Sequence, residues 1–358
     1  MSEPVPTAPA RVVIAAGGTA GHVVPAIAVA DALRAEGAEV VFVGGQRAEA
    51  QLVPAAGYPL DPIRVEGISR SKPLKAARAV AKAGAAVGAA GRILRRRRAD
   101  AVLGGGGYVA GPVGLAAVAR RIPLVLTEAD SHLGLANRLL APFARRVCLA
   151  FAIEGREPPR YLVTGRPVPP TVEGREAARA AFGLPEDGVC VLVFGGSLGA
   201  RSINRTAPEA FAGVPYSVLH IAGARDFPEL TPPGPHYELR EYEQDFGRAL
   251  LAADLAVARA GGSVFELAQY GLPALLVPYP HAAADHQSAN ARWMAQAGAA
   301  VVVPDEELSP KRLRREVDAI VCDPGRLAAM AAASHRLARP DAARAVAREV
   351  LAAARSRR

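Results

Sequence analysis

The sequence predicts an α/β protein of two Rossmann-like domains, each built on a parallel sheet. Short apolar runs that end in paired glycines alternate with helix-like segments in the first half of the chain, and the same alternation starts again after a Pro/Gly-rich stretch at 155–170. Strands that alternate with helices favour parallel βαβ units with helices on both faces of the sheet. A length of 358 residues suits two domains with a sizeable core each.

The individual elements follow from these runs in order along the chain. In the first half we expect strands at 12–15, 40–43, 101–103 and 124–126, with a helix over 25–36. In the second half we expect strands at 189–194, 218–221, 255–258, 274–277 and 300–302, with a helix that begins near Ser202. The Pro/Gly-rich stretch between the halves is predicted to be the linker.

Composition narrows the class of protein further. Charged residues make up 22% of the chain, close to the average of globular proteins, which argues against disorder. The three cysteines are scattered, which excludes a disulfide framework and a thiolate zinc site and fits a reducing cytosol. The opening MSEPVPTAPAR lacks the apolar core of a signal peptide, and no window reaches the ~18 apolar residues of a membrane span. The net charge of +9 lies in the first half, because residues 1–163 hold 21 Lys+Arg against 12 Asp+Glu and residues 164–358 hold 22 of each.

The two halves of the chain contain a similar short sequence motif. Residues 12–21 are VVIAAGGTAG and residues 191–199 are VLVFGGSLG, each an apolar strand followed by two glycines, a hydroxyl residue, a spacer and a third glycine. A glycine loop before a helix can hold a phosphate on backbone N–H groups; two ordinary strand-to-helix turns are the alternative. Neither segment is G-x-G-x-x-G and the chain has no G-x-x-x-x-G-K-[ST], so NAD and P-loop nucleotide sites are disfavoured.

Two more glycine-rich segments follow expected strands. Four consecutive glycines at 104–107 favour a close approach to a ligand over a bare turn. The segment RAGGSVFE at 259–266 opens a helix, where the glycines and Ser263 can donate to a diphosphate and Glu266 can accept from sugar hydroxyls. A capping arrangement of Ser263 and Glu266 is the alternative. Polar residues at 279–281 and 285–290 follow the strand at 274–277, at the sheet edge where α/β proteins bind ligands.

Six segments in register resemble the MurG family of bacterial lipid II synthases. They are GGTAGH at 17–22, GGYVAGPVGLAA at 106–117, GLANRLLA at 134–141, GGSLGAR at 195–201, RAGG…E at 259–266 and DHQ..NA at 285–291. The resemblance implies a GT-B fold with the active site in the cleft between the domains. It implies a first domain at 1–163, joined by a final helix at about 342–358, that binds a lipid-linked muramyl-pentapeptide acceptor. The second domain, 164–341, then binds UDP-N-acetylglucosamine.

The resemblance also implies site residues. The acceptor is expected at Gly106, Gly107 and Tyr108, and the donor at Thr19, Ala20, Gly21, Asp130, Arg166, Ser197, Glu243, Gly262, Ser263, Val264, Glu266 and Gln287. Within the donor set, Ser197 is implied to contact the diphosphate or uridine, Glu266 the ribose and Gln287 the sugar. The chain departs from the family at three places. Residues 127–130 are Thr-Glu-Ala-Asp, where the family has His-Glu-Gln-Asn. The family reads Gly-Asn-Pro-Val-Arg where this chain has Gly165-Arg166-Pro167-Val168-Pro169, so the arginine lies three positions earlier, and Glu243 replaces a residue that is usually apolar.

The implied reaction is an inverting transfer in which the muramyl 4-hydroxyl attacks the anomeric carbon and UDP leaves, through a state that resembles an oxocarbenium ion. His22 is the candidate base, since a histidine near neutral pKa suits proton abstraction, and Glu128 is the alternative. A role for His22 in binding phosphate or orienting its loop stays open. The chain has no D-x-D motif, so we expect no metal and no other cofactor; helix N-termini would stabilise the leaving diphosphate.

A lipid-linked acceptor requires a membrane surface, and residues 68–98 form a basic amphipathic segment. We therefore expect a peripheral protein on the cytoplasmic face of the cell membrane, bound to the anionic inner leaflet. A solvated basic face is an alternative; with 5% aromatic residues, we expect no nucleic-acid partner. Two other functions stay open: a related UDP-sugar glycosyltransferase with another lipid or glycan acceptor, and a non-catalytic nucleotide-sugar-binding membrane scaffold.

Overall fold

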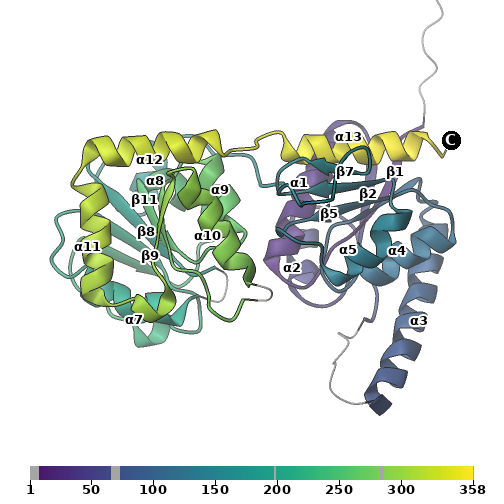
Figure 1. Cartoon of the computed structure of the whole chain (residues 1–358), viewed down its shortest axis with the longest axis horizontal. Helices are drawn as coiled ribbons and strands as arrows, with labels where there is room; N and C mark the ends of the chain where they lie inside the picture. Colours follow the sequence, from purple (N-terminus) through teal and green to yellow (C-terminus); the bar gives the residue numbers. More distant parts are fainter. Residues whose placement is uncertain (1–7, 66–72, 197–198, 283–284, 358) are drawn as a thin grey trace, which may run out of the picture. The chain divides into compact units, whose positions relative to one another are not determined.

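The computed structural model describes residues 8–65, 73–196, 199–282 and 285–357, with side chains from 84 onward in the helix that starts at Pro73. The chain forms two compact units (Figure 1). Unit 1 comprises residues 1–169 and 339–358, and unit 2 comprises residues 170–338. The boundary thus follows Pro169 rather than residue 163, and unit 2 ends at Ala338 rather than residue 341. Within the described residues, no helix is long and apolar enough to span a membrane.

Unit 1 contains a seven-stranded parallel sheet in the order β3-β2-β1-β4-β5-β6-β7. The strands are β1 Arg11–Ala15, β2 Glu39–Gly44, β3 Leu60–Pro62, β4 Ala101–Gly104, β5 Leu124–Glu128, β6 Arg146–Leu149 and β7 Tyr161–Val163. The helices are α1 Ala20–Ala35, α2 Ala48–Ala55, α3 Pro73–Arg96, α4 Ala110–Ala119, α5 Leu135–Leu140, the 3-10 turn η1 Ala141–Phe143 and α13 Ala342–Arg355.

The two faces of this sheet follow from the period-two alternation of its strands. On one face, Val12 and Ile14 pack with α1 and with Val346 and Val350 of α13. On the other face, Val13 packs with the buried residues of α3 and α4. Helix α13 therefore completes the core of unit 1, although more than 160 residues separate it in the sequence from the rest of that unit.

Unit 2 contains a six-stranded parallel sheet in the order β10-β9-β8-β11-β12-β13. The strands are β8 Cys190–Phe194, β9 Ser217–Ile221, β10 Tyr237–Arg240, β11 Leu255–Ala258, β12 Ala274–Leu276 and β13 Ala300–Val302. The helices are α6 Arg175–Ala181, α7 Arg201–Ala210, α8 Phe246–Ala252, α9 Ser263–Gln269, α10 His286–Gln296, α11 Pro310–Val321 and α12 Pro324–Arg336, with 3-10 turns η2 Phe227–Glu229 and η4 Asp305–Glu307.

The predicted pair of parallel-sheet domains is confirmed, and each expected strand is present to within two residues at its ends. Four short strands were not expected: β3, β6, β7 and β10. The predicted linker at 155–170 was wrong up to Val163, because β7 lies inside this stretch and pairs with β6 at the edge of the first sheet, whereas the boundary between the units falls at the end of the stretch. Helix α1 also begins at Ala20 rather than at residue 25, which places the first glycine loop directly on a helix N-terminus.

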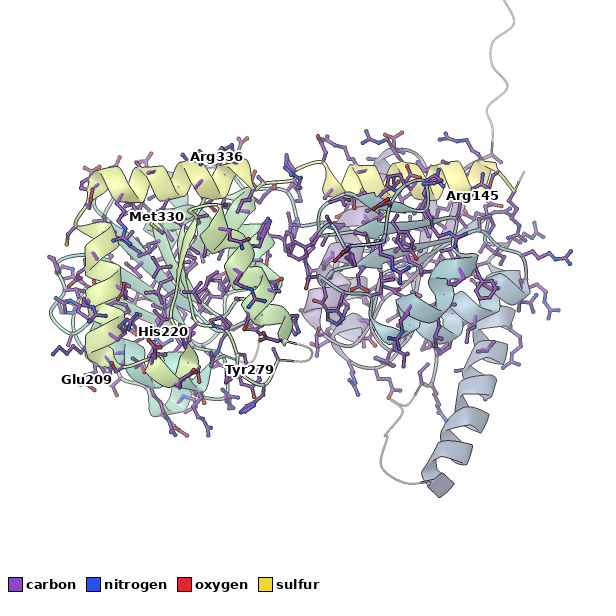
Figure 2. All side chains as sticks on the ribbon, viewed as in Figure 1. Arg145, Glu209, His220, Tyr279, Met330 and Arg336 are labelled. Atoms are coloured by element: carbon purple, nitrogen blue, oxygen red, sulfur yellow. The ribbon has the colours of Figure 1, made fainter. Side chains whose placement is uncertain are left out.

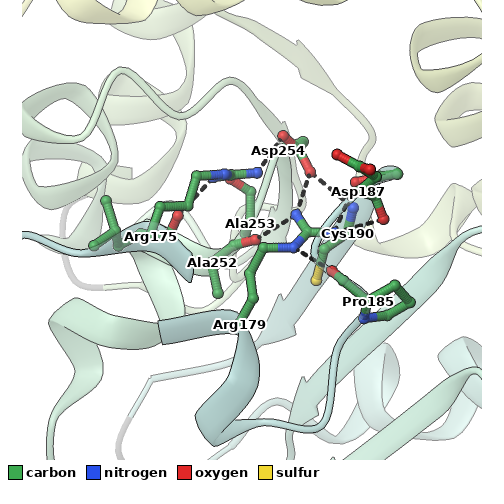
Figure 3. Close-up of polar contacts among 10 residues, drawn as sticks. Arg175, Arg179, Pro185, Asp187, Cys190, Ala252, Ala253 and Asp254 are labelled. Carbon is green, nitrogen blue, oxygen red and sulfur yellow. Dashed lines mark hydrogen bonds and ion pairs between the residues drawn. The ribbon is translucent and has the colours of Figure 1, made fainter. Parts of the chain in front are cut away.

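A buried arginine closes the end of unit 2 at which its strands begin (Figure 3). Arg179 is almost completely buried and donates to the carbonyl oxygens of Pro185 (2.7 Å), Gly188 (2.7 Å) and Ala252 (3.1 Å). Its guanidinium also lies 3.4 Å from Asp254 Oδ2, the oxygen that accepts from the N–H of Cys190 at the start of β8. This arginine therefore supplies donors that an apolar core would lack.

Candidate active site

In unit 1, three glycine loops lie at the ends of adjacent strands. They follow β1, β2 and β4, whose carboxyl ends meet at one edge of the parallel sheet. The loops are in direct contact: a Cβ on Gly107, which has φ +77°, would lie 1.8 Å from the carbonyl oxygen of Gly17. A Cβ on Gly106 would lie 2.7 Å from Cδ2 of His22. Contacts within the protein therefore require the glycines at 104–107. The predicted close approach of a ligand to this backbone is not needed to explain them.

His22 lies in the first turn of α1, at this edge of the sheet. Thr19 occupies the N-cap position but makes no side-chain capping bond; its Oγ1 lies 3.3 Å from Nδ1 of His22. Arg166 donates to the carbonyl oxygen of Gly21 at 2.5 Å. Burial lowers the pKa of His22, the positive charge of Arg166 lowers it further, and Asp130 raises it in part. A neutral imidazole at neutral pH can accept a proton, as a general base requires.

The expected residues around His22 do not all have free polar groups. The hydroxyl of Tyr108 donates to Glu49 Oε1 at 2.7 Å, and burial together with Glu49 raises the pKa of Tyr108 to about 12. The side-chain hydroxyl is therefore used inside unit 1, and a ligand would contact the ring or the backbone. Ala20 and Gly21 contribute N–H groups of the first turn of α1, which have no partner within that helix.

Glu128, the alternative base, is engaged in its own loop. Its buried carboxylate accepts from the N–H groups of Asp130 (3.2 Å) and Gly134 (2.8 Å) and from Nδ2 of Asn137 (2.9 Å). These bonds shape the turn that leads into α5 and occupy both oxygens. The geometry therefore favours a structural role for Glu128 and leaves His22 as the candidate base.

In unit 2, the buried side chain of Arg259 anchors the loop between β11 and α9 to neighbouring elements. Nη1 of Arg259 donates to the carbonyl oxygen of Val277 (3.1 Å) and to Asp305 Oδ1 (2.6 Å), and Nη2 donates to Ser202 Oγ (2.8 Å). Nδ2 of Asn290 donates to the carbonyl oxygen of Ala260 at 3.0 Å. These contacts fix the backbone of the loop without using its N–H groups.

The backbone of the 259–266 loop has features that suit a ligand-binding role. Gly262, not Ser263, occupies the N-cap position of α9, so the capping alternative for Ser263 and Glu266 is wrong. Val264 is fully buried and its N–H donates to the carbonyl oxygen of Gly261, so only its backbone is near the loop surface. Gly261 does not have a positive φ, and a Cβ on it would meet no heavy atom within 4 Å, so nothing inside the protein requires a glycine there.

The remaining donor candidates in unit 2 lie in other loops. Glu243 Oε1 accepts from the N–H of Asp245 at 2.8 Å, just before α8, so its side chain turns back on its own loop. Gln287 Oε1 accepts from the N–H of Tyr279 at 2.9 Å, which joins the start of α10 to the loop after β12. Glu266 is half-buried in α9. Ser197 lies outside the described residues.

A buried network lies beside Gly199, at the end of the second glycine loop, where a Cβ would lie 3.0 Å from Nδ2 of Asn204. Nδ2 of Asn204 donates to the carbonyl oxygen of Ala222 (2.8 Å) and to Asp226 Oδ2 (2.8 Å), so its Oδ1 is left to accept from Nε2 of His220 at 3.0 Å. Nδ1 of His220 is then the unprotonated nitrogen and accepts from the hydroxyl of Tyr237 at 2.7 Å. Burial lowers the pKa of His220 to about 4. Sequence reasoning missed this network and Glu49, because no motif marks residues that act through other residues.

Neither the cavity in unit 1 nor any group of metal-binding side chains among the described residues indicates a further candidate site. A cavity of about 590 Å³ in unit 1 lies where β5, β6 and β7 begin, lined by arginines that include Arg121, Arg160 and Arg145, the last of which is labelled in Figure 2. None of the candidate residues lines it. Across the part of the chain that the structure describes, no three His, Cys, Asp or Glu residues are grouped so as to hold a metal ion.

The chain matches known families along both units. The model of the glycosyltransferase family 28 N-terminal domain matches residues 12–149, and that of the family's C-terminal domain matches residues 190–346. Two relatives are each named UDP-N-acetylglucosamine--N-acetylmuramyl-(pentapeptide) pyrophosphoryl-undecaprenol N-acetylglucosamine transferase. The one from Methylococcus capsulatus is 45% identical over 350 residues, and the one from Moorella thermoacetica is 41% identical over 365 residues; each match covers 95% of this chain and 98% of the relative.

A solved structure agrees with the sequence relatives. The crystal structure of Acinetobacter baumannii MurG matches with a TM-score of 0.75 at 29% identity, covering 96% of this chain and 100% of that one. The GT-B fold implied by the resemblance is therefore confirmed. The chain belongs to glycosyltransferase family 28 and, within it, to the family of these N-acetylglucosamine transferases.

Proposed function

We propose that this protein transfers N-acetylglucosamine from UDP-N-acetylglucosamine to the 4-hydroxyl of undecaprenyl-diphospho-N-acetylmuramoyl-pentapeptide, with inversion at the anomeric carbon. The names of the relatives support the substrates. The observation that carries the proposal for this chain is the loop at 259–266. The N–H groups of Gly262 and Ser263 have no hydrogen-bond partner among the described residues, and nothing inside the protein requires the glycine at 261, while the Arg259 side chain anchors the loop to Val277 and Asp305.

The donor is assigned to unit 2. The N–H groups of Gly262 and Ser263 have no hydrogen-bond partner among the described residues, and they precede or begin a helix, where an anion is stabilised. Glu266, one turn into α9, accepts from the ribose hydroxyls, and Gln287 and Ser197 complete the donor contacts. These donors stabilise the negative charge that develops on the diphosphate as UDP leaves.

The acceptor is assigned to unit 1, at Gly106, Gly107 and Tyr108, with His22 as the base. In the tautomer that this mechanism requires, Nδ1 of His22 carries the proton and donates to Thr19 Oγ1, 3.3 Å away, and Nε2 takes the proton of the 4-hydroxyl. The hydroxyl oxygen forms a bond to the anomeric carbon while the bond from that carbon to UDP breaks. Asp130 and Arg166 are assigned to the donor side of this region, where Arg166, despite its shifted sequence position, reaches Gly21.

We also infer that unit 1 binds the anionic inner leaflet of the cell membrane, at its cytoplasmic face. Unit 1 holds 28 Lys+Arg against 14 Asp+Glu, a net charge of +14, whereas unit 2 holds 15 against 20, a net charge of −5. Leu135, Leu139 and Phe143 are more than half exposed on α5 and η1, and Arg138 and Arg145 are exposed beside them in the sequence. Exposed apolar side chains among arginines are typical of an interfacial surface.

The segment 68–98 supports this membrane role less than its sequence suggested. Residues 68–72 lie outside the described residues, and the side chains of 73–83 are not described. In the rest of α3, the apolar residues Ala90, Ile93 and Leu94 are buried in the core of unit 1. Arg96 and Arg97 pair with Asp61 at 2.9 and 2.8 Å. The apolar face of this part of the helix is therefore not available to a membrane.

The direct test is UDP release with a lipid-linked muramyl-pentapeptide, measured over a panel of UDP-sugars. We expect turnover with UDP-N-acetylglucosamine and a large loss in His22→Ala. Turnover with another UDP-sugar would support the related-transferase alternative, which the departures at Asp130 and Arg166 keep open. Binding of UDP-N-acetylglucosamine without turnover would support the scaffold alternative.

A further inference from the structure

Unit 1 contains a buried carboxylate that the proposed mechanism does not use. Glu49, the second residue of α2, has 0% of its surface exposed. Its Oε2 accepts from the N–H of Gly18 at 2.8 Å, and its Oε1 accepts from the N–H of Gly45 at 2.8 Å and from the hydroxyl of Tyr108 at 2.7 Å. It forms no ion pair with any described residue. A buried charge held only by hydrogen bonds is expensive to maintain, so it calls for a reason beyond packing.

The three donors come from three different loops. Gly18 follows β1, Gly45 follows β2 and Tyr108 follows β4. A Cβ on Gly17 would lie 2.8 Å from Glu49 Oε1, and a Cβ on Gly44 would lie 2.7 Å from Glu49 Cγ. The glycines beside the strand ends therefore make room for this one side chain, and the carboxylate and the loops determine each other's positions.

The charged form of Glu49 is the one that this site accepts. Burial raises its pKa, but the hydrogen bonds from Tyr108, Gly18 and Gly45 outweigh burial and lower it below the usual value. All three partners are donors, so only a group with two acceptor oxygens satisfies them together. A glutamine has one such oxygen; its NH₂ group would face the N–H of Gly18 or the Gly45 and Tyr108 donors.

We infer that Glu49 is a positioning residue for the transfer reaction: through Gly18 it fixes the first glycine loop, and with it Thr19 and His22, and through Tyr108 it fixes the third loop on which His22 rests. The inference rests on the proposed function, because it assigns the loop a part in that reaction. It predicts that the isosteric change Glu49→Gln is more harmful than Tyr108→Phe, since the first leaves donors facing each other and the second removes one bond.

The test compares three variants of the full chain: Glu49→Gln, Tyr108→Phe and Asp100→Asn. Asp100 is the matched control, a buried carboxylate at the opposite end of the same sheet that accepts from the N–H and guanidinium of Arg11. We expect Glu49→Gln to lower kcat by about 100-fold, as a displaced catalytic loop does, with the KM for UDP-N-acetylglucosamine unchanged. Hydrogen exchange of the 17–22 segment should rise by about tenfold or more. Tyr108→Phe should lower kcat less, and Asp100→Asn should lower only the melting temperature.

Two outcomes would overturn the inference. One is a Glu49→Gln protein with wild-type kcat and unchanged exchange at 17–22. The other is an Asp100→Asn protein that loses as much kcat at an equal drop in melting temperature, since Glu49 would then contribute stability alone. If the wild-type chain binds UDP-N-acetylglucosamine but transfers nothing, the proposed function fails instead, and the exchange measurement still decides whether Glu49 holds the loop.

Discussion

In unit 1 the loops after β1, β2 and β4 converge on a buried anion, Glu49, whereas in unit 2 the loops after β11 and β12 converge on a buried cation, Arg259. A buried carboxylate binds N–H groups, so the amides of Gly18 and Gly45 are no longer available to a phosphate. A buried guanidinium binds carbonyl oxygens, here of Val277 and Pro278, and leaves loop N–H groups for a ligand. The loops of unit 1 and the 259–266 loop of unit 2 are therefore suited to the different tasks proposed for them, a fixed base in unit 1 and a diphosphate in unit 2.

The net charges of the two units would favour unit 1 as the site of the anionic nucleotide, whereas the loop geometry favours unit 2. Net charge therefore does not decide where the nucleotide binds. Unit 1 carries +14 and unit 2 carries −5, yet the loop geometry favours unit 2 for the doubly charged diphosphate. Local N–H groups at a helix N-terminus outweigh a net charge spread over a solvated surface, because salt screens the latter over about 10 Å. The positive charge of unit 1 is better explained by an extended anionic surface.

The largest expected effect comes from matched glycine substitutions in the two units. Gly107→Ala in unit 1 places a Cβ 1.8 Å from a backbone oxygen at a positive φ, so we expect a loss of several kcal/mol in the free energy of unfolding. Gly261→Ala in unit 2 meets open space, so the free energy of unfolding should stay within about 0.5 kcal/mol while the KM for UDP-N-acetylglucosamine rises. Calorimetry and donor kinetics on both variants check this. Equal destabilisation by the two would contradict the contrast between the loops.

The same comparison shows how much the sequence could predict. Apolar runs and paired glycines located the central strands of both sheets, because buried parallel strands are continuous in hydrophobicity. The edge strands β3, β7 and β10 were missed, since they have three or four residues of which at most one is buried; β6, of which three residues in four are buried, was missed as well. Motifs placed His22 and the 259–266 loop correctly at strand ends, but the partners of those loops, such as Glu49 and Asn204, come from elements that no local pattern connects to them.

Arginines at the starting ends of the two sheets provide the second test. Arg179 of unit 2 is buried on carbonyl oxygens, whereas Arg145 of unit 1 is exposed beside a cavity (Figure 2). Arg179→Met leaves the carbonyl oxygens of Pro185, Gly188 and Ala252 without the donor that Arg179 supplies and removes one of the partners of Asp254, so we expect a loss of about 3–5 kcal/mol in the free energy of unfolding. Arg145→Gln should change it by less than about 0.5 kcal/mol. Urea unfolding of unit 2, followed by the fluorescence of Trp293, measures the first, and calorimetry measures the second. A neutral Arg179→Met would show that this network contributes no stability.

Histidines in the two units differ in exposure, and so in their effect on stability. The folded-state pKa of His220, lowered by burial to about 4, lies below the unfolded value of about 6.5, so the unfolded chain binds more protons between these pH values. The stability that neutral His220 contributes is therefore present above about pH 6.5 and is lost as the pH falls toward 4, by up to about 3 kcal/mol. Urea unfolding of unit 2 across this range, in the wild type and in His220→Gln, measures the loss. An equally steep decline in His220→Gln would assign the effect to other groups.

The smallest expected effect concerns the partly buried His22 of unit 1, whose charge state affects the rate rather than the fold. A neutral imidazole is required to accept the proton, so kcat should rise with pH through a midpoint below 6.5 and then level off. Arg166 lowers the pKa of His22, so Arg166→Gln should move the midpoint to higher pH, and Asp130 raises it, so Asp130→Asn should move the midpoint to lower pH. Arg166→Lys keeps the positive charge and should leave the midpoint in place, although it alters the bond to Gly21. If the midpoint of the pH dependence of kcat shifts equally in Arg166→Lys and Arg166→Gln, Arg166 acts through the loop geometry. If the midpoint responds to none of these changes, His22 is not the base.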